Sequence, residues 1–218
     1  GAQKSLPRSS PVVKTYPTID FQIRYVSSCY VFAKEDGSNV RAEWSKKRGF
    51  WKFGRRKALL DDSNEWLVEV EGIIMRDWAE PLSAIFKKQR LQKATAFFEF
   101  LGDNSFAGNH VAEPHRCVLL DVAAHPKGIL HPRDFVKVFK GLPHARLLHQ
   151  GNFNREMEEK IRSGTFPGMP FEGVIVKGGF VSPGRPMMFK VKSQAWFERL
   201  RAQYPQHEDN AEAPRGPQ

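Results

Sequence analysis

The feature that most constrains the fold is a series of short runs rich in β-branched and aromatic residues, separated by turn-forming residues. These runs do not alternate regularly with helical segments, as they would in a parallel sheet built from strand–helix–strand units. The sequence therefore predicts an α+β chain with largely antiparallel sheets. The candidate strands are Cys29–Lys34, Val40–Trp44, Phe50–Gly54, Glu65–Val70, Ala96–Leu101, Cys117–Val122, Glu172–Lys177 and Met187–Lys192.

Turn and capping residues divide the chain further. A turn at Asp36–Gly37–Ser38 follows the first candidate strand, and Gly49 is expected to turn a second hairpin. The candidate helices begin with Pro or a capping residue, or end before Gly or Pro. They are Pro81–Lys93, Pro132–Lys140, Asn154–Ser163 and Ser193–Tyr204.

The length of 218 residues suits one compact unit, which we place at residues 17–205. Residues 1–16 are polar and contain Pro and Ser, so we expect a flexible N-terminal arm. Residues 206–218 are rich in Glu, Asn, Ala and Pro, so we expect a disordered tail. The first residue is Gly rather than Met, which suggests a processed or trimmed chain.

Charge and cysteine content indicate the partners and the compartment. Lys and Arg total 34 against 24 Asp and Glu, a net charge of +10 that favours a phosphate-rich partner or a membrane surface. The two cysteines have no CxxC spacing and fit a reducing compartment. No apolar run is long enough to span a bilayer. We expect a soluble intracellular protein, cytoplasmic or, in a eukaryote, nuclear or organellar, and monomer is one expected state.

Three features bear ionisable groups in strand-like surroundings. Lys34 ends an apolar run just before a Gly turn, where burial of its stem can point the amine inward. Lys190 and Lys192 stand two apart in a strand-like run, so both face the same side and call for an anion. Glu99 and Glu172 lie among apolar residues and call for a cation, a metal or a sugar hydroxyl. Each feature also fits an ordinary solvent-exposed position.

The segment from Lys46 to Lys57 holds seven Lys or Arg residues interleaved with Phe50, Trp51 and Phe53. Cations for phosphates beside aromatic rings for bases are typical of a nucleic-acid surface. The alternative is a solvated basic hairpin. The sequence contains neither a GxxxxGK[ST] nor a GxGxxG pattern, so neither a Walker site nor a Rossmann fingerprint is present.

Together and in order, these pieces resemble the covalent nucleotidyltransferase superfamily of ligases and capping enzymes, and are most similar to the phage-type RNA ligase 2 family. The segment 34–39 (KEDGSN) resembles motif I and 52–56 (KFGRR) resembles motif Ia. The segment 98–102 (FEFLG) resembles motif III and 118–122 (VLLDV) motif IIIa. The segment 172–177 (EGVIVK) matches motif IV and 190–192 (KVK) motif V. The resemblance covers about residues 29–193.

The resemblance implies an α+β nucleotidyltransferase core (ATP-grasp-like) of antiparallel sheets flanked by helices, with a nucleotide cleft between the sheets. It implies that Lys34 is the nucleophile that receives AMP from ATP, assisted by Lys190 and Lys192, before transfer to an RNA 5′-phosphate and sealing by a 3′-hydroxyl. Mg²⁺ or Mn²⁺ would assist, with Glu172 nearest the ion, directly or through water. The implied nucleotide-binding residues are Asp36, Gly37, Asn39, Arg56, Arg55, Glu99, Glu172 and Lys177, and the RNA-binding residues of the basic hairpin are Lys46, Lys47, Arg48 and Lys52.

Two departures from the resemblance affect these expectations. Leu119 and Leu120 stand where relatives offer an aromatic ring to the purine, so base stacking is expected from elsewhere. About 26 residues follow Lys192, too few for the C-terminal domain of many relatives, so either the core works alone or the chain is a fragment. Capping with GTP and DNA ligation remain alternatives, although Asn39 favours the RNA ligase branch. A non-catalytic RNA-binding module is the alternative of a different class.

Overall fold

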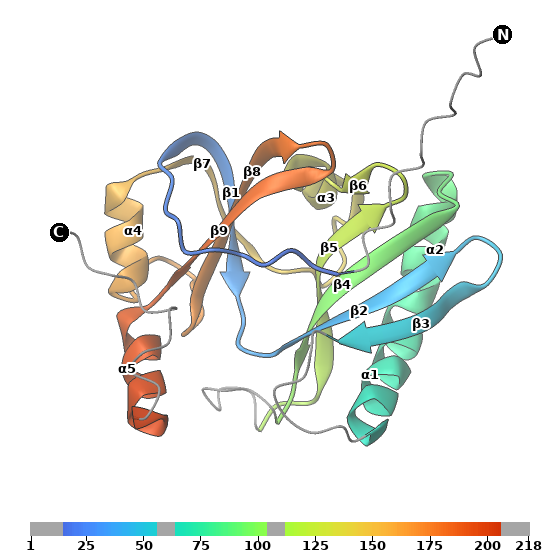
Figure 1. Cartoon of the computed structure of the whole chain (residues 1–218), viewed down its shortest axis with the longest axis horizontal. Helices are drawn as coiled ribbons and strands as arrows, with labels where there is room; N and C mark the ends of the chain where they lie inside the picture. Colours follow the sequence, from blue (N-terminus) through green and yellow to red (C-terminus); the bar gives the residue numbers. More distant parts are fainter. Residues whose placement is uncertain (1–14, 56–63, 104–111, 206–218) are drawn as a thin grey trace, which may run out of the picture.

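The computed structural model describes residues 15–55, 64–103 and 112–205, which form two antiparallel sheets flanked by helices (Figure 1). The predicted α+β class is confirmed. Sheet A has the order β7 (Leu147–Phe153), β1 (Val26–Lys34), β8 (Gly173–Ser182) and β9 (Arg185–Lys192). Sheet B has the order β3 (Gly49–Arg55), β2 (Ser38–Ser45), β4 (Lys93–Leu101), β5 (Arg116–Ala124) and β6 (Gly128–Ile129).

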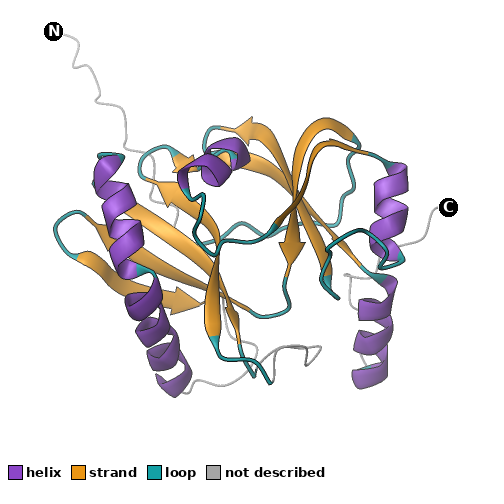
Figure 2. Cartoon of the chain, turned by 180° about the vertical axis from the view of Figure 1, so that it is seen from behind, coloured by secondary structure: helices purple, strands orange, loops and turns teal. Residues whose placement is uncertain are grey.

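The helices cover the outer faces of the sheets, as Figure 2 shows from behind. Helices α1 (Asn64–Asp77) and α2 (Ala79–Lys88) pack on sheet B, where Phe86 meets Trp44 edge-on. Helix α3 (Pro132–Val138) contributes Phe135 to the core between the sheets, where it meets Phe32. Helices α4 (Arg155–Arg162) and α5 (Gln194–Gln203) lie beside sheet A. No helix of the described residues is long and apolar enough to cross a membrane.

Side-chain alternation along β1 divides the core in two. Tyr30 and Phe32 face the larger core, which lies between the sheets and extends to α1, α2 and α3. Cys29 and Val31 face the smaller core, which lies between sheet A and α4. The next residue of the first set is Lys34, so its side chain projects from the same face of sheet A as Phe32. The register of β1 thereby directs Lys34 toward sheet B.

The turn after Lys34 joins the two sheets and does not close a hairpin. We expected the strands on either side of it to form the first of two hairpins, but β1 lies in sheet A and β2 in sheet B. Gly37 is required here by space: a Cβ at this position would lie 2.3 Å from the backbone oxygen of Phe100 in β4. The second expected turn, at Gly49, does close a hairpin between β2 and β3.

Two further expectations differ from the structure. The segment Glu65–Val70 belongs to α1 and not to a strand. The apolar residues Val70, Ile73 and Ile74 follow one another at helical spacing and are all buried. The six-residue segment considered from the sequence is too short to reveal this helical period. Strands β6 and β7 were not expected, because β7 contains polar residues and Gly151 and shows no clear alternation.

The beginning of the described chain crosses both sheets. In Figure 1 this segment, dark blue, runs across β9 and β4. Asp20 forms a bridge with Phe189 of β9, and the ring of Tyr16 packs against Phe97 of β4. Tyr16 is buried, although we placed it in the flexible arm. An isolated Tyr in a polar segment carries no periodic signal, so its burial follows from tertiary contacts alone.

Candidate active site

Lys34 and Glu172 form the centre of a charged cluster at the end of β1. Lys34 pairs across the strands with Gly173, which places it beside Glu172 at the start of β8. The Lys34 Nζ atom lies 2.8 Å from Glu172 Oε1, and the Glu172 side chain is 4% exposed. Gly173 also permits β9 to lie close to β8, because a Cβ there would lie 2.1 Å from the Val191 backbone oxygen of β9. The two residues are thus held together by strand pairing.

Lys192 joins the cluster from β9. Its Nζ atom lies 3.3 Å from the same Glu172 oxygen, so one buried carboxylate bridges two lysines. The Lys192 ammonium group also lies 3.6 Å from the ring centre of Trp196, which stabilises the buried cation. Lys190, two residues earlier on the same face, lies with its Nζ atom 4.3 Å from the ring centre of Phe21. The Lys192 Nζ atom lies 5.6 Å from the same ring centre, so the two lysines share a face as predicted.

Sheet B contributes the remaining polar groups of the cluster. Glu99 of β4 pairs across the strands with Asn39 of β2, which places these two predicted residues side by side. The backbone N–H of Gly37 donates to the Glu99 carboxylate. Asp36, in the same turn, is buried. The structure therefore brings together residues as far apart in sequence as Lys34 and Lys192, which are separated by 158 positions.

The pKa values in this cluster reflect its excess of carboxylates. Burial lowers the pKa of the Lys34 ammonium group, but Glu172, followed by Glu99 and Asp36, raises it further than burial lowers it. Protein groups alone therefore keep a proton on Lys34.

The pKa of Glu99 is also raised, but here burial is the main cause. Burial raises the pKa of its carboxyl group to about 7, and Glu172 and Asp36 act in the same direction, whereas Lys34 and the N–H of Gly37 act against them. Near neutral pH this carboxyl group exists in both forms. It can accept a hydrogen bond when ionised and donate one when protonated.

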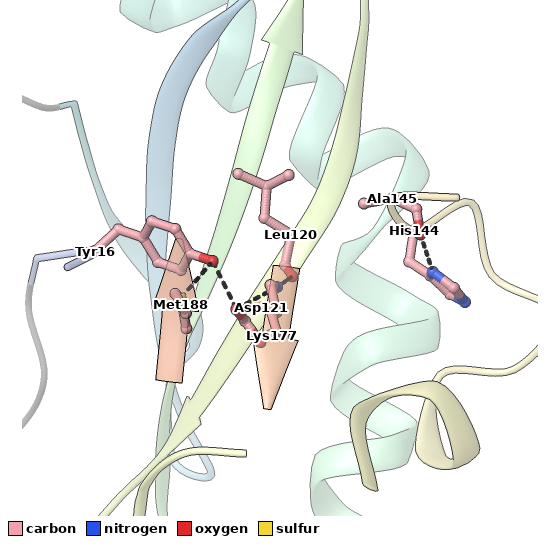
Figure 3. A network of polar contacts seen from close by, with 7 residues as sticks. All are labelled: Tyr16, Leu120, Asp121, His144, Ala145, Lys177 and Met188. Atoms are coloured by element: carbon pink, nitrogen blue, oxygen red, sulfur yellow. Dashed lines mark hydrogen bonds and ion pairs between the residues drawn. The ribbon is translucent and has the colours of Figure 1, made fainter. Parts of the chain in front are cut away.

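Lys177, predicted to bind the nucleotide, occupies a separate buried network between the sheets (Figure 3). Its Nζ atom lies 2.6 Å from Asp121 Oδ2 and 3.0 Å from the Leu120 backbone oxygen. The hydroxyl group of Tyr16 donates to the same Asp121 oxygen at 2.6 Å. Lys177 stands four residues from Gly173, roughly 13 Å along β8. Its ammonium group links β8 to β5, and its predicted nucleotide contact stays a prediction.

The other predicted residues lie along sheet B. Arg55 ends β3 opposite Val40, one position from Asn39, at the end of the sheet nearest Lys34. Arg56 lies outside the described residues. The basic hairpin of Lys46, Lys47, Arg48 and Lys52 lies at the other end of the same strands.

A divalent ion fits the oxygen donors of the cluster in part. Glu172, Glu99 and Asp36 offer hard carboxylate ligands. Within the described ranges, however, no group of three or more His, Cys, Asp or Glu side chains has metal-binding geometry. An ion here would take other ligands from water or phosphate, as Mg²⁺ commonly does.

Several residues around the cluster carried little sequence signal. Trp196 lies within the predicted helix Ser193–Tyr204, and its contact with Lys192 depends on how α5 docks. Phe21 lies in a segment without periodicity, so nothing in the sequence places it over Lys190. Asp121 was noted within the motif IIIa segment, and its pairing with Lys177 becomes visible only when the sheets face each other.

Comparison with known proteins yields structural neighbours alone. No family model and no curated protein sequence matches the chain. Among solved structures it is similar to Naegleria gruberi RNA ligase with PPi, at 15% identity and a TM-score of 0.58, covering 93% of this chain and 64% of that one. A mutant of the same ligase with ATP and Mn gives 16% identity and a TM-score of 0.57, covering 88% and 61%.

A further mutant of that ligase, with AMP and Mn, gives 16% identity and a TM-score of 0.56. The chain spans 61% to 64% of the length of these neighbours. At this identity the likeness concerns the backbone arrangement, and it agrees with the antiparallel sheets described above. The chain therefore shares the α+β fold of this Naegleria gruberi RNA ligase.

Proposed function

We propose that the chain is the adenylylating core of an ATP-dependent RNA ligase that works through a lysyl-AMP intermediate on Lys34. The observation that carries the proposal is the cluster of Lys34, Glu172 and Lys192 at the junction of two sheets. It stands at the position that the resemblance to motif I assigned to the nucleophile. The fold of the neighbouring RNA ligases supports the same reading.

In the first step the Lys34 amine attacks the α-phosphorus of ATP. A nitrogen–phosphorus bond forms, the bond to the bridging oxygen of pyrophosphate breaks, and pyrophosphate leaves. Lys34 must first release a proton to water, although Glu172 and its neighbours raise the pKa of the ammonium group. Lys192, bonded to the same carboxylate, can retain Glu172 when Lys34 turns to the phosphate.

Lys190 and Lys192 supply fixed positive charge on the face that Lys34 shares. Preorganised cations stabilise the charge that develops on a phosphoryl group in the transition state. A bound Mg²⁺ or Mn²⁺ beside Glu172 would neutralise phosphate oxygens and offset the carboxylate field around Lys34. We propose that Glu99, which pairs with Asn39 across β4 and β2, binds the ribose and that Asn39 contacts the nucleotide.

In the later steps AMP moves from Lys34 to the 5′-phosphate of an RNA, and a 3′-hydroxyl group then attacks that phosphate and releases AMP. The basic hairpin is proposed to contact the RNA backbone. Joining of RNA ends is the chemistry of RNA repair, which we propose as the setting of this activity.

Covalent labelling tests the proposal. The purified chain is incubated with α-labelled ATP or GTP and Mg²⁺ or Mn²⁺, denatured and examined for protein-bound label. We expect label from ATP, acid-labile as a phosphoramidate, and none in Lys34→Ala. Lys87→Ala, at the exposed end of α2, is the matched control and should label normally.

Retained label in folded Lys34→Ala would remove Lys34 from the mechanism. Label from GTP in place of ATP would favour a capping enzyme, and joining of nicked DNA in preference to RNA would favour a DNA ligase. No label from either nucleotide would favour a non-catalytic RNA-binding protein.

A further inference from the structure

A pocket lies at the far end of sheet B, away from Lys34. The β2–β3 hairpin and the beginning of β4 enclose a hollow of about 600 Å³. Its size falls in the range of about 300 to 1,000 Å³ typical of small-molecule sites. Such a hollow holds one small group and does not admit the width of a nucleic-acid duplex.

The rim of this pocket combines cations with an exposed ring. Lys46, Lys47, Arg48, Lys52 and Lys93 line it, against the single carboxylate that Glu43 contributes to the lining. The Glu43 carboxylate lies 3.8 Å from Lys52, which offsets its charge. The indole ring of Trp51 is 46% exposed, and the Arg48 guanidinium group lies 4.9 Å from its centre. The rim therefore offers a flat stacking surface beside several phosphate-binding groups.

The wall of the pocket contains a buried hydroxyl group without a hydrogen-bond partner in the described structure. Thr95 of β4 is 0% exposed, lines the pocket, and its Oγ1 atom has no partner. A buried hydroxyl group left unpaired costs about 1 to 3 kcal/mol. Because Thr95 lines the pocket, a polar ligand that enters with a small shift of the neighbouring side chains would satisfy this hydroxyl group. This is a second indication of a ligand, independent of the charged rim.

The pocket shares a sheet face with the candidate active site. Lys93, Thr95, Phe97 and Glu99 alternate along one side of β4, opposite the side that packs on α1 and α2. Thr95 and Glu99 are four residues apart, roughly 13 Å. Tyr16 packs against Phe97 between them, so the pocket and the Lys34 cluster are separate sites on one face. Along β2, Arg41 also lies between the pocket and the Lys34 cluster. Its guanidinium group lies over Gly54 of β3.

We propose that this pocket binds one unpaired nucleotide of the RNA substrate. Trp51 stacks on the base, the surrounding cations contact the flanking phosphates, and Thr95 hydrogen-bonds the nucleotide. Rings beside cations are the chemistry by which proteins hold single strands, whereas duplex RNA is contacted through its backbone. The inference deepens the proposed function, on which its choice of RNA rests, by assigning a substrate with a single-stranded segment near the junction.

Binding measurements with Trp51 variants test the proposal without any catalysis. Fluorescence anisotropy at fixed salt follows a labelled single-stranded RNA and the same RNA annealed to its complement. Trp51→Ala should weaken single-strand binding about 5- to 150-fold, the range expected for loss of one base–ring stack. Duplex binding should not change, and Trp51→Phe should recover most of the loss. Phe180→Ala, a matched exposed ring on β8, should change neither affinity.

Thr95→Val adds a test that a purely structural role would not pass. The isosteric change removes the unpaired hydroxyl group, so the free protein should become more resistant to thermal unfolding. Single-strand affinity should nevertheless fall, because the bound nucleotide loses its partner. A variant that is more stable and binds RNA equally well would show that Thr95 contacts no ligand and would overturn its role.

The remaining arms separate this proposal from its rivals. Equal single-strand affinity of wild type and Trp51→Ala would overturn the pocket, and so would equal competition by a polyglutamate peptide, which offers charge without bases. Binding of single-stranded DNA of the same sequence shows whether the pocket distinguishes ribose from deoxyribose. Binding of the RNA or the DNA that depends on Trp51 supports the pocket. Covalent labelling of wild type is measured in parallel, so failure of the active-site proposal appears there and failure of the pocket appears in the binding data.

Discussion

At the scale of single residues, burial and the neighbouring carboxylates act in opposite directions on the pKa of Lys34. A nucleophilic lysine must be neutral when it attacks, yet the carboxylates around Lys34 raise its pKa. One of these carboxylates, Glu172, also forms an ion pair with Lys192. The cluster is therefore built to bind positive charge, and the approach of a metal nucleotide would change its proton balance.

Replacing Lys192 or Lys190 by Ala should slow adenylylation of Lys34 by on the order of 10²-fold or more, because each is proposed to supply a preorganised charge near the α-phosphate. RNA affinity should change little. Rates of labelling and anisotropy titrations on the same preparations check both statements, with Lys87→Ala as the control. A defect confined to RNA affinity would place these lysines at an RNA surface instead.

Glu99 gives a prediction for stability against pH. Its pKa of about 7 in the folded chain lies above the ordinary value of 4.5, so the folded state binds this proton more tightly than the unfolded state. The resulting stability is fully present below the ordinary pKa and is lost as the pH rises through the folded value. The loss is on the order of 3 kcal/mol.

Glu99→Gln removes this titration. The free energy of unfolding of the variant, relative to wild type, should therefore increase between about pH 5 and about pH 8. Denaturant titrations at several pH values measure it. Glu198→Gln, an exposed residue of α5, should show no such trend. A constant difference for Glu99→Gln across this range would show that Glu99 keeps an ordinary pKa.

At the scale of elements, the β2–β3 hairpin places its basic residues away from the charged cluster. The sequence predicted both the hairpin and its charge, because Gly49 and the run of Lys and Arg are local signals. The pocket between this hairpin and β4 could not be predicted, because Thr95 is far from the hairpin in sequence. Strand pairing alone brings Thr95 opposite Glu43.

Changing Lys46, Lys47 and Lys52 together to Gln should flatten the slope of log affinity for RNA against log salt by roughly two units, because each phosphate contact contributes about 0.7 to 0.9. Titrations of a labelled RNA at several salt concentrations measure the slope. The matched control changes Arg133, Lys137 and Lys140, on and after α3, to Gln and should keep the wild-type slope. Equal slopes in the hairpin variant and wild type would mean that RNA binds elsewhere.

At the scale of the whole molecule, the relation of the two sheets decides the site. Lys34 and Glu172 belong to sheet A, and Glu99 belongs to sheet B. The β1–β2 turn joins the sheets covalently, and the Lys177–Asp121 ion pair joins them through the core. Tyr16 completes this link from the N-terminal segment. A loss of this network should therefore loosen the molecule as a whole.

Lys177→Met leaves the buried Asp121 carboxylate without its cation and should cost about 3 to 5 kcal/mol of unfolding free energy. Tyr16→Phe removes one hydrogen bond to a charged group and should cost about 1.5 to 3 kcal/mol. The double variant Lys177→Met, Asp121→Asn removes both charges while keeping an acceptor for Tyr16, so it should recover most of the first loss. Denaturant unfolding measures all three, and a neutral effect of Lys177→Met would show that the Lys177–Asp121 ion pair does not stabilise the fold.

The sequence by itself determined the α+β class, most strands, and the facing of Lys190 and Lys192, because these depend on local alternation and turn residues. The motif order also singled out Lys34, Glu99 and Glu172 before any contact was known. Tertiary structure alone decided the remainder. It assigned β1 and β2 to different sheets, turned Glu65–Val70 into a helix, and buried Tyr16.

The physical reason is the range of the interactions involved. Periodicity and turn chemistry act over a few residues, whereas the proton on Lys34 depends on carboxylates from β8, β4 and a turn. Their fields add only when packing removes water and brings the two sheets face to face. The sequence could therefore name the charged residues, and the fold decided which charge state they hold.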